Sequence, residues 1–297
     1  RAVAQVPVTR SNALAGLINI QTNDPDDSHF ASLKLSVAEY GTETFGFVGN
    51  LPISAQLKAR FVIESHKSDG YMTNDFLGRD DLNDRDELTL RTKLAWNVAD
   101  NWDINLSIAN IDVDNGYDAF SLDNTRHTLS DEPGFDRQDS TYVSLKSMWR
   151  WEAFNMEFLL NQAASDLDYG YDEDWSFTGI HPFGYTSMDQ YFRKRDTSSI
   201  ELRLLSNDSA RILSDSSDWV VGIYALRSDE NLLRQYTFLA TNFMSQYDFE
   251  TIAVFSEIDT LLSDSLTLSS GFRFERRDTN YHDSDGVRFT PNESHWG

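Results

Sequence analysis

Apolar and polar residues alternate along most of the chain after Pro25. Between residues 57 and 63 the odd positions are apolar, whereas Lys58 and Arg60 occupy even positions. A period of two is typical of β-strands with one apolar and one polar face. We count about eleven such segments of roughly ten residues, the length at which a tilted strand crosses a bilayer. Helical periodicity is nearly absent, so the pattern predicts an all-β, antiparallel sheet.

The connections between these segments alternate between short and long. The predicted short turns are residues 51–56, 97–101, 150–153 and 259–265, and the predicted long polar stretches are 68–86, 115–139, 165–195, 229–247 and the tail after 276. Outer-membrane barrels have short periplasmic turns and long extracellular loops, whereas a soluble sandwich has no reason to sort its loops in this way. Two connections depart from the rule, because 40–42 is very short and 207–218 is long.

Composition narrows the possible functions. The 297 residues include 48 acidic and 25 basic side chains, and the net charge of −23 argues against nucleic-acid binding. No apolar run reaches about 18 residues, so we expect any membrane span to be a β-strand. There is no cysteine, and the six histidines show no paired metal-ligand spacing. No Gly-x-Ser-x-Gly motif occurs either, so we expect a protein that is not an enzyme.

A run near the start carries a family resemblance. Residues 12–21, followed by Thr22 and Pro25, resemble the segment that closes the plug domain of TonB-dependent outer-membrane receptors. The residues that carry it are Asn12, Ala13, Gly16, Ile18, Asn19, Ile20, Thr22 and Pro25. The family usually has glycine where Arg10 stands. A second resemblance, to the second outward loop and returning strand of the iron-type receptors of this family, is carried by residues 68–71, Asn74 and residues 78–86, 90–91 and 94–96.

The resemblance implies a fold class and two domains. It implies an antiparallel transmembrane β-barrel, here partial, with about eleven of the 22 strands of a plugged barrel. Residues 1–25 would be the C-terminal end of the plug, and residues 26–297 the first half of the barrel with long extracellular loops. Half a barrel leaves two unpaired edges in lipid, so we expect the chain to be a fragment whose signal peptide lies outside it.

The alternation also predicts which side chains face the lumen. In a barrel wall the apolar positions face lipid and the polar positions face inward. The predicted lumen-facing residues are Lys34, Lys58, Arg60, Arg91, Lys93, Arg203 and Arg273, which would contact plug side chains or line the route opened when the plug moves. A soluble sheet with these residues on its solvent face is the alternative.

The predicted outward loops carry aromatic residues suited to ligand capture. The candidates are Tyr71, Phe76, Tyr117, Phe120, Tyr171 and Trp175, within a wider set that includes Tyr169, Phe177, Tyr185, Tyr191 and Tyr236. The same residues would serve equally well as packing that stabilises long loops. Five tryptophans at or beside the short turns (Trp96, Trp102, Trp149, Trp151 and Trp219) match an interfacial aromatic girdle.

Acidic residues are concentrated in the same loops, and two interpretations remain open. They are solvated faces that bridge cations at the lipopolysaccharide surface, or some of them bind calcium. No segment has the EF-hand order of ligands, so no calcium site is assigned.

The resemblance implies transport across the outer membrane of a Gram-negative bacterium. The expected function is TonB-energised uptake of a scarce ligand, best matched by a ferric siderophore. The expected partners are outer-membrane lipid and lipopolysaccharide, a small-molecule iron chelate, and TonB through an N-terminal segment outside this sequence. No protein-bound cofactor is expected. Cobalamin, haem or oligosaccharide uptake, a passive porin-like barrel and a soluble all-β surface module remain as alternatives.

Overall fold

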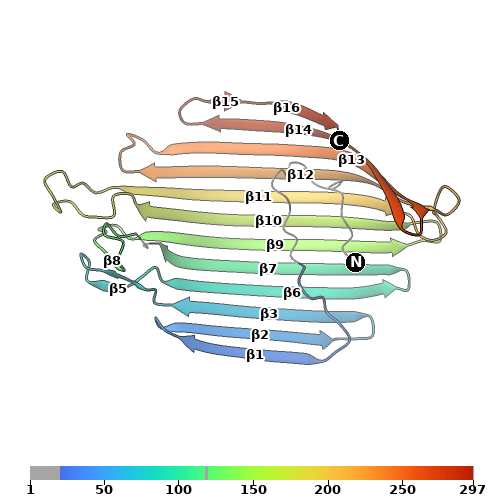
Figure 1. The fold of residues 1–297 in the computed structure, drawn as a ribbon, viewed down its shortest axis with the longest axis horizontal. Coiled ribbons are helices and arrows are strands. Elements are labelled where there is room, and N and C mark those ends of the chain that lie inside the picture. Colours follow the sequence, from blue (N-terminus) through green and yellow to red (C-terminus); the bar gives the residue numbers. More distant parts are fainter. Residues whose placement is uncertain (1–20, 118–119, 297) are drawn as a thin grey trace.

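The chain forms one large antiparallel sheet (Figure 1). The structure is a computed structural model that describes residues 21–117 and 120–296. Each long strand pairs with the long strand before it in the sequence, so the connections are hairpins. The long strands are β1 (Phe30–Ala38), β2 (Thr42–Pro52), β3 (Leu57–Ser68), β6 (Arg85–Ala99), β7 (Trp102–Tyr117), β9 (Gly134–Arg150), β10 (Asn155–Asp172), β11 (Met188–Leu205), β12 (Ser217–Tyr236), β13 (Phe243–Ser263) and β14 (Leu266–Asp283). In the described part of the chain, no helix is long and apolar enough to cross a bilayer.

Short strands complete the architecture. At one edge, β15 (Arg288–Phe289) and β16 (Asn292–Trp296) both pair with β14. A separate small sheet combines β4 (Met72–Asn74), β5 (Arg79–Leu82) and β8 (His127–Thr128). The large sheet begins at β1 and does not close on itself, so the predicted partial, all-β antiparallel barrel is confirmed.

The strands are much longer than the ten residues that the alternation predicts. From β6 onward they contain 15 to 21 residues. The ladder between β10 and β11, for example, continues from the pair Asn155 and Leu205 to the pair Asp172 and Met188. The prediction was wrong because charged residues replace apolar ones on the convex face at the outward strand ends, as Asp166 and Asp168 do in β10. The lipid-facing pattern therefore ends before the hydrogen bonding does. The predicted long loops are correspondingly shorter and, in the described residues, cover 69–84, 120–133, 173–187 and 237–242.

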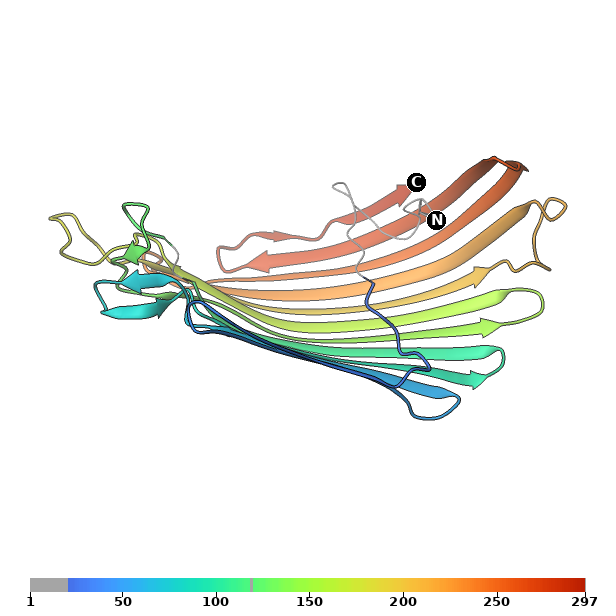
Figure 2. The same cartoon turned by 60° about the horizontal axis from the view of Figure 1, so that its bottom comes forward.

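The sheet curves into a trough (Figure 2), and the side chains on its two faces differ chemically. Cross-strand partners share a face, and pairs such as Leu94 with Leu106 and Leu160 with Ile200 place apolar side chains together. Many of these side chains are exposed, including Leu35 at 70% and Ile252 at 64%. The concave face carries the opposite, polar positions. Soluble proteins rarely expose so large an apolar surface, which is what a barrel presents to lipid.

Tryptophans gather at the end of the sheet where the short turns lie. Trp102 and Trp149 stack with ring centroids 5.3 Å apart, and Trp102 Nε1 donates to Ser147 Oγ at 2.9 Å. Trp219 Nε1 donates to the Ala210 carbonyl at 2.8 Å. Indole rings with a satisfied N–H suit the boundary between hydrocarbon and headgroups, as the predicted girdle requires.

The assignment of the faces predicts opposite effects at two neighbouring positions of β6. Leu90→Arg places a cation on the apolar face, so it should lower the free energy of unfolding in lipid vesicles by about 2–4 kcal/mol. Thr89→Arg is the matched control, because residue 89 pairs with Glu64 on the polar face and should be tolerated. Equal losses from both variants in denaturant titrations would contradict the assignment.

Candidate functional site

Residues 21–29 cross the concave face and attach to it (Figure 2). Lys93 Nζ contacts Asp24 Oδ1 at 2.7 Å and donates to the Thr22 carbonyl at 3.0 Å. Lys58 Nζ lies 2.8 Å from Asp27 Oδ1. The lysine side chains are only 16% and 18% exposed, so these ion pairs are shielded from water on the wall side. Two predicted lumen-facing residues therefore hold the N-terminal segment.

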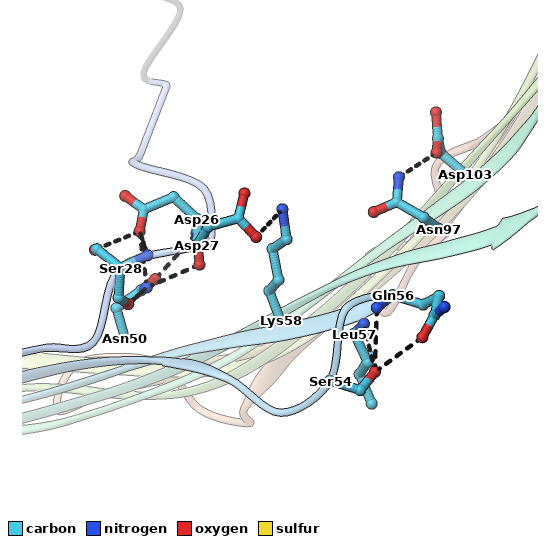
Figure 3. Close-up of polar contacts among 10 residues, drawn as sticks. All are labelled: Asp26, Asp27, Ser28, Asn50, Ser54, Gln56, Leu57, Lys58, Asn97 and Asp103. Atoms are coloured by element: carbon cyan, nitrogen blue, oxygen red, sulfur yellow. Dashed lines mark hydrogen bonds and ion pairs between the residues drawn. The ribbon is translucent and has the colours of Figure 1, made fainter. Parts of the chain in front are cut away.

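A cluster of hydrogen bonds among Asp26, Ser28 and Asn50, beside Lys58, strengthens this attachment (Figure 3). Asn50 on β2 is 4% exposed, and its Nδ2 donates to Asp26 Oδ1 at 2.9 Å and to the Ser28 carbonyl at 2.5 Å. The Asp26 amide donates back to Asn50 Oδ1 at 3.2 Å. The side chain of Asn50 thus supplies hydrogen bonds to the backbone and side chains of residues 26–28, which lie outside the sheet. The alternation gave no signal for Asn50, since one polar residue between Gly49 and Leu51 does not reveal which partners its amide will meet.

Arg60 and Arg91 lie beside this attachment. With Lys93, Val48, Val62 and residues 21–23 they line a cavity of about 330 Å³ between the wall and the N-terminal segment. Lys34 of β1 pairs with Gly46 of β2 and is exposed on the same concave face as Arg60 and Arg91. The basic residues of β1, β3 and β6 therefore form one positively charged arc of the wall.

Arg203 and Arg273 sit in a different environment, because carboxylates of the wall itself neutralise them. Arg203 Nε contacts Glu201 at 2.6 Å, and Glu157 lies between Arg203 and Lys146 at 3.4 and 2.6 Å. Arg273, whose side chain is 11% exposed, lies 2.5 Å from the buried Glu275. The arc formed by β9 to β14 thus satisfies its own charges.

The predicted plug end lies mostly outside the described residues. Asn12, Ala13, Gly16, Ile18, Asn19 and Ile20 belong to the part that the structure does not describe. Of this motif, Thr22 accepts a hydrogen bond from Lys93 at its carbonyl, and Pro25 directly precedes Asp26, which is hydrogen-bonded to Asn50. The division of the chain at residue 25 stays a prediction.

The outward loops pack against one another through two kinds of contact. Asn74 in β4 is fully buried, and its Nδ2 donates to the Ser130 carbonyl of the next loop at 2.7 Å. Phe76 stacks on Phe177 at 4.3 Å, and Phe120 stacks on Trp175 at 5.0 Å. Four predicted ligand candidates are involved in loop packing, since Tyr71 also meets Tyr40 edge-on at 6.4 Å.

Four other tyrosines lie on the concave face near the outward ends of β7, β10 and β11: Tyr117, Tyr169, Tyr171 and Tyr191. The rings of Tyr117 and Tyr169 are 4.8 Å apart, and Tyr169 lies 5.6 Å from Tyr171 and 6.4 Å from Tyr191. Three of them line a pocket of about 510 Å³, which is within the range of small-molecule sites. Its lining residues are Asp136, Arg137, Gln138, Leu167, Asp168, Tyr169, Tyr171, Tyr191 and Arg193.

Ion pairs surround this tyrosine pocket. Arg193 Nε and Arg195 Nε lie 3.0 and 2.7 Å from the two carboxylate oxygens of Glu230. Arg234 donates to both oxygens of Asp189 at 2.9 and 2.7 Å, and Asp189 is 2% exposed. A bidentate pair of this kind fixes both side chains and neutralises the guanidinium with the carboxylate.

Asp172, at the outward tip of β10 and well beyond the apolar band, is a titrating group of the loop region. Burial raises the pKa of this carboxyl to about 6. Its oxygens accept hydrogen bonds from Ser130 Oγ at 2.5 Å and from the amides of Asp174 and Trp175 at 3.0 Å. The carboxyl therefore joins two loops and is costly to ionise.

Calcium binding by the loops, which the sequence left open as one of two interpretations, receives no candidate site here. Within 21–117 and 120–296, no group of three or more acidic or histidine side chains is arranged to hold a metal ion.

The open, curved sheet with an apolar convex face and a polar concave face has the form of part of a transmembrane β-barrel wall. No family model matches the sequence. Solved structures share the fold. The ferric yersiniabactin uptake receptor FyuA from Yersinia pestis has a TM-score of 0.75 and 20% identity, over 95% of this chain and 44% of that receptor.

Two further receptors show the same likeness. The alcaligin outer-membrane receptor FauA from Bordetella pertussis has a TM-score of 0.68 and 11% identity, over 92% of this chain and 40% of that receptor. The ferric-catecholate import receptor Fiu from E. coli K12 has a TM-score of 0.68 and 12% identity, with coverages of 95% and 48%. The chain therefore spans less than half the length of these receptors. The fold predicted from the resemblance to TonB-dependent receptors is confirmed.

The attachment of the N-terminal segment should weaken when Lys93 loses its charge. Lys93→Gln removes the ion pair with Asp24, worth up to about 1 kcal/mol for a partly exposed pair, so proteolysis within residues 21–29 should accelerate several-fold. Lys67→Gln, which breaks an exposed pair with Asp86 on the convex face, is the control and should leave the rate unchanged. Equal cleavage rates in Lys93→Gln and the unaltered protein would contradict the attachment.

Asp172 should make the packing of the loops depend on pH. A carboxyl whose folded pKa is raised stabilises the fold below its unfolded pKa and loses that contribution as the pH rises through about 6. Amide exchange at residues 174 and 175, corrected for intrinsic rates, should therefore show less protection at about pH 7 than at about pH 4. Asp172→Asn keeps an acceptor for both amides and should abolish the difference, whereas Asp168→Asn should preserve it.

Proposed function

We propose that this chain is part of the barrel of a TonB-dependent outer-membrane receptor that imports a ferric siderophore. The observation that carries the proposal is the concave wall, which holds the N-terminal segment at one arc and a tyrosine pocket of ligand size at its outward end. A receptor needs both features on the same surface, because the ligand must be bound above a gate that the wall keeps in place.

The chemistry of the wall agrees with a chelated metal as cargo. A siderophore brings its own iron ligands, so the receptor recognises the organic surface of the complex rather than the ion. Aromatic rings with a few placed polar groups are the usual lining of such small-molecule sites. The structures that share this fold are described as receptors for ferric yersiniabactin, alcaligin and ferric catecholates.

The two arcs suggest how a gate would work. The end of the predicted plug and the residues that follow it are held by Lys93, Lys58 and Asn50, so this junction would remain attached when the rest of the plug moves. The arc of β9 to β14 neutralises its own charges and makes no ion pair with the described N-terminal residues 21–29. A plug could therefore separate from this arc without leaving buried, unpaired charges on the wall.

Uptake of radioactive iron tests the proposal. The gene encoding this chain would be deleted and restored in its host, and ⁵⁵Fe uptake measured from a panel of ferric siderophores in cells with and without functional TonB. We expect uptake of at least one complex to require both the gene and TonB. Uptake that requires the gene but persists without TonB would indicate a passive, porin-like barrel, and no dependence on the gene would remove the transport function.

A further inference from the structure

We infer that the tyrosine pocket selects ferric chelates that carry aromatic rings and no net negative charge. The inference rests on the proposed function and adds the class of ligand to it. Three tyrosine rings on adjacent strands line the pocket, and Leu167 and Gln138 extend it. Such a surface favours flat rings, because ring pairs at 4.5–7 Å add attraction beyond area burial.

The charges around the pocket decide against anionic chelates. A receptor for a polyanion would offer free guanidinium groups, as in phosphate and carboxylate recognition. Here Arg193 and Arg195 both lie against the one carboxylate of Glu230, and Arg234 donates through Nε and Nη2 to the two oxygens of Asp189. Arg137, whose position also lines the pocket, contacts Asp114 at 2.6 Å.

Further acidic groups make the local balance more negative. Asp136 lines the pocket directly. Glu173 lies nearby, and its Oε2 accepts hydrogen bonds from Ser187 Oγ at 2.6 Å and from Tyr236 OH at 2.7 Å. The described chain as a whole is strongly acidic. Among the described residues around the pocket, carboxylates outnumber guanidinium groups, so a trianionic complex would meet a negative potential on approach.

Three hexadentate iron complexes separate ring content from charge. The first has three phenolate–oxazoline arms and is neutral and aromatic. The second has three catecholamide arms and is aromatic with three negative charges. The third has three hydroxamate arms and is neutral without rings. Binding would be measured by quenching of tryptophan fluorescence in the purified receptor that contains this chain, with its remaining strands and plug.

We expect the neutral aromatic complex to bind at least about tenfold more tightly than either of the others. Tighter or equal binding of the trianionic complex would overturn the inference while leaving the proposed uptake function intact. Binding of none of the three, together with uptake that does not depend on TonB, would overturn the proposed function and this inference with it.

A charge substitution sharpens the test. Glu230→Gln keeps a hydrogen-bond acceptor but frees Arg193 and Arg195, so affinity for the trianionic complex should rise about tenfold relative to the neutral one. Glu250→Gln on the convex face removes the same charge beside Arg227 and should change neither affinity. An unchanged preference in Glu230→Gln, with unchanged strand content by circular dichroism, would contradict the role of the paired arginines.

The rings are tested separately. Tyr169→Leu removes the central ring of the pocket and should weaken the neutral aromatic complex about tenfold, with no effect on the hydroxamate complex. Phe192→Leu removes a ring from the opposite face of the neighbouring strand and is the matched control. Equal effects of the two variants would show that the tyrosines act only in packing.

Discussion

The pairing of backbone groups in a non-aqueous solvent is the constraint on which this structure depends. Hydrocarbon offers no partner to an open amide or carbonyl, so a strand that enters it must be hydrogen-bonded along its whole length. The continuous antiparallel ladders meet this requirement for the strands that lie between β1 and β14. Period-two alternation then fixes the rest, because each residue that faces lipid leaves its neighbour facing the lumen.

Charged side chains on the concave face are neutralised in two ways, and each way belongs to a different arc of the wall. On β2, β3 and β6, polar side chains bind the N-terminal segment through Asp24, Asp26 and Asp27. On β9 to β14, arginines are neutralised by carboxylates of the same strands or of the next one. One arc is thus built to hold another part of the chain, and the other arc is complete without it.

The sequence predicted the fold class well and the functional surface less well. Alternation is strongest where one face meets lipid, so the apolar band and the approximate number of long strands could be counted from residues alone. Beyond the band both faces meet water, and hydropathy no longer distinguishes strand from loop. This is why Tyr117 and Tyr171 were predicted in loops although they end β7 and β10. The pocket was missed for the same reason, because it depends on register between β9, β10 and β11. Asn50 and Asn74 gave no signal, since an amide shows its importance only when its partners are placed.

The packing of the outward loops has a consequence for how such a protein can change over generations. Asn74 is buried against a carbonyl of the following loop, and stacked rings connect both loops to residues 173–187. A single loop therefore cannot be lengthened, exchanged or grafted onto another barrel without exposing the contacts of its neighbours. Variation at this surface, where phage and antibodies bind bacterial receptors, is expected to accumulate as matched sets of substitutions in all three loops rather than as independent changes in one.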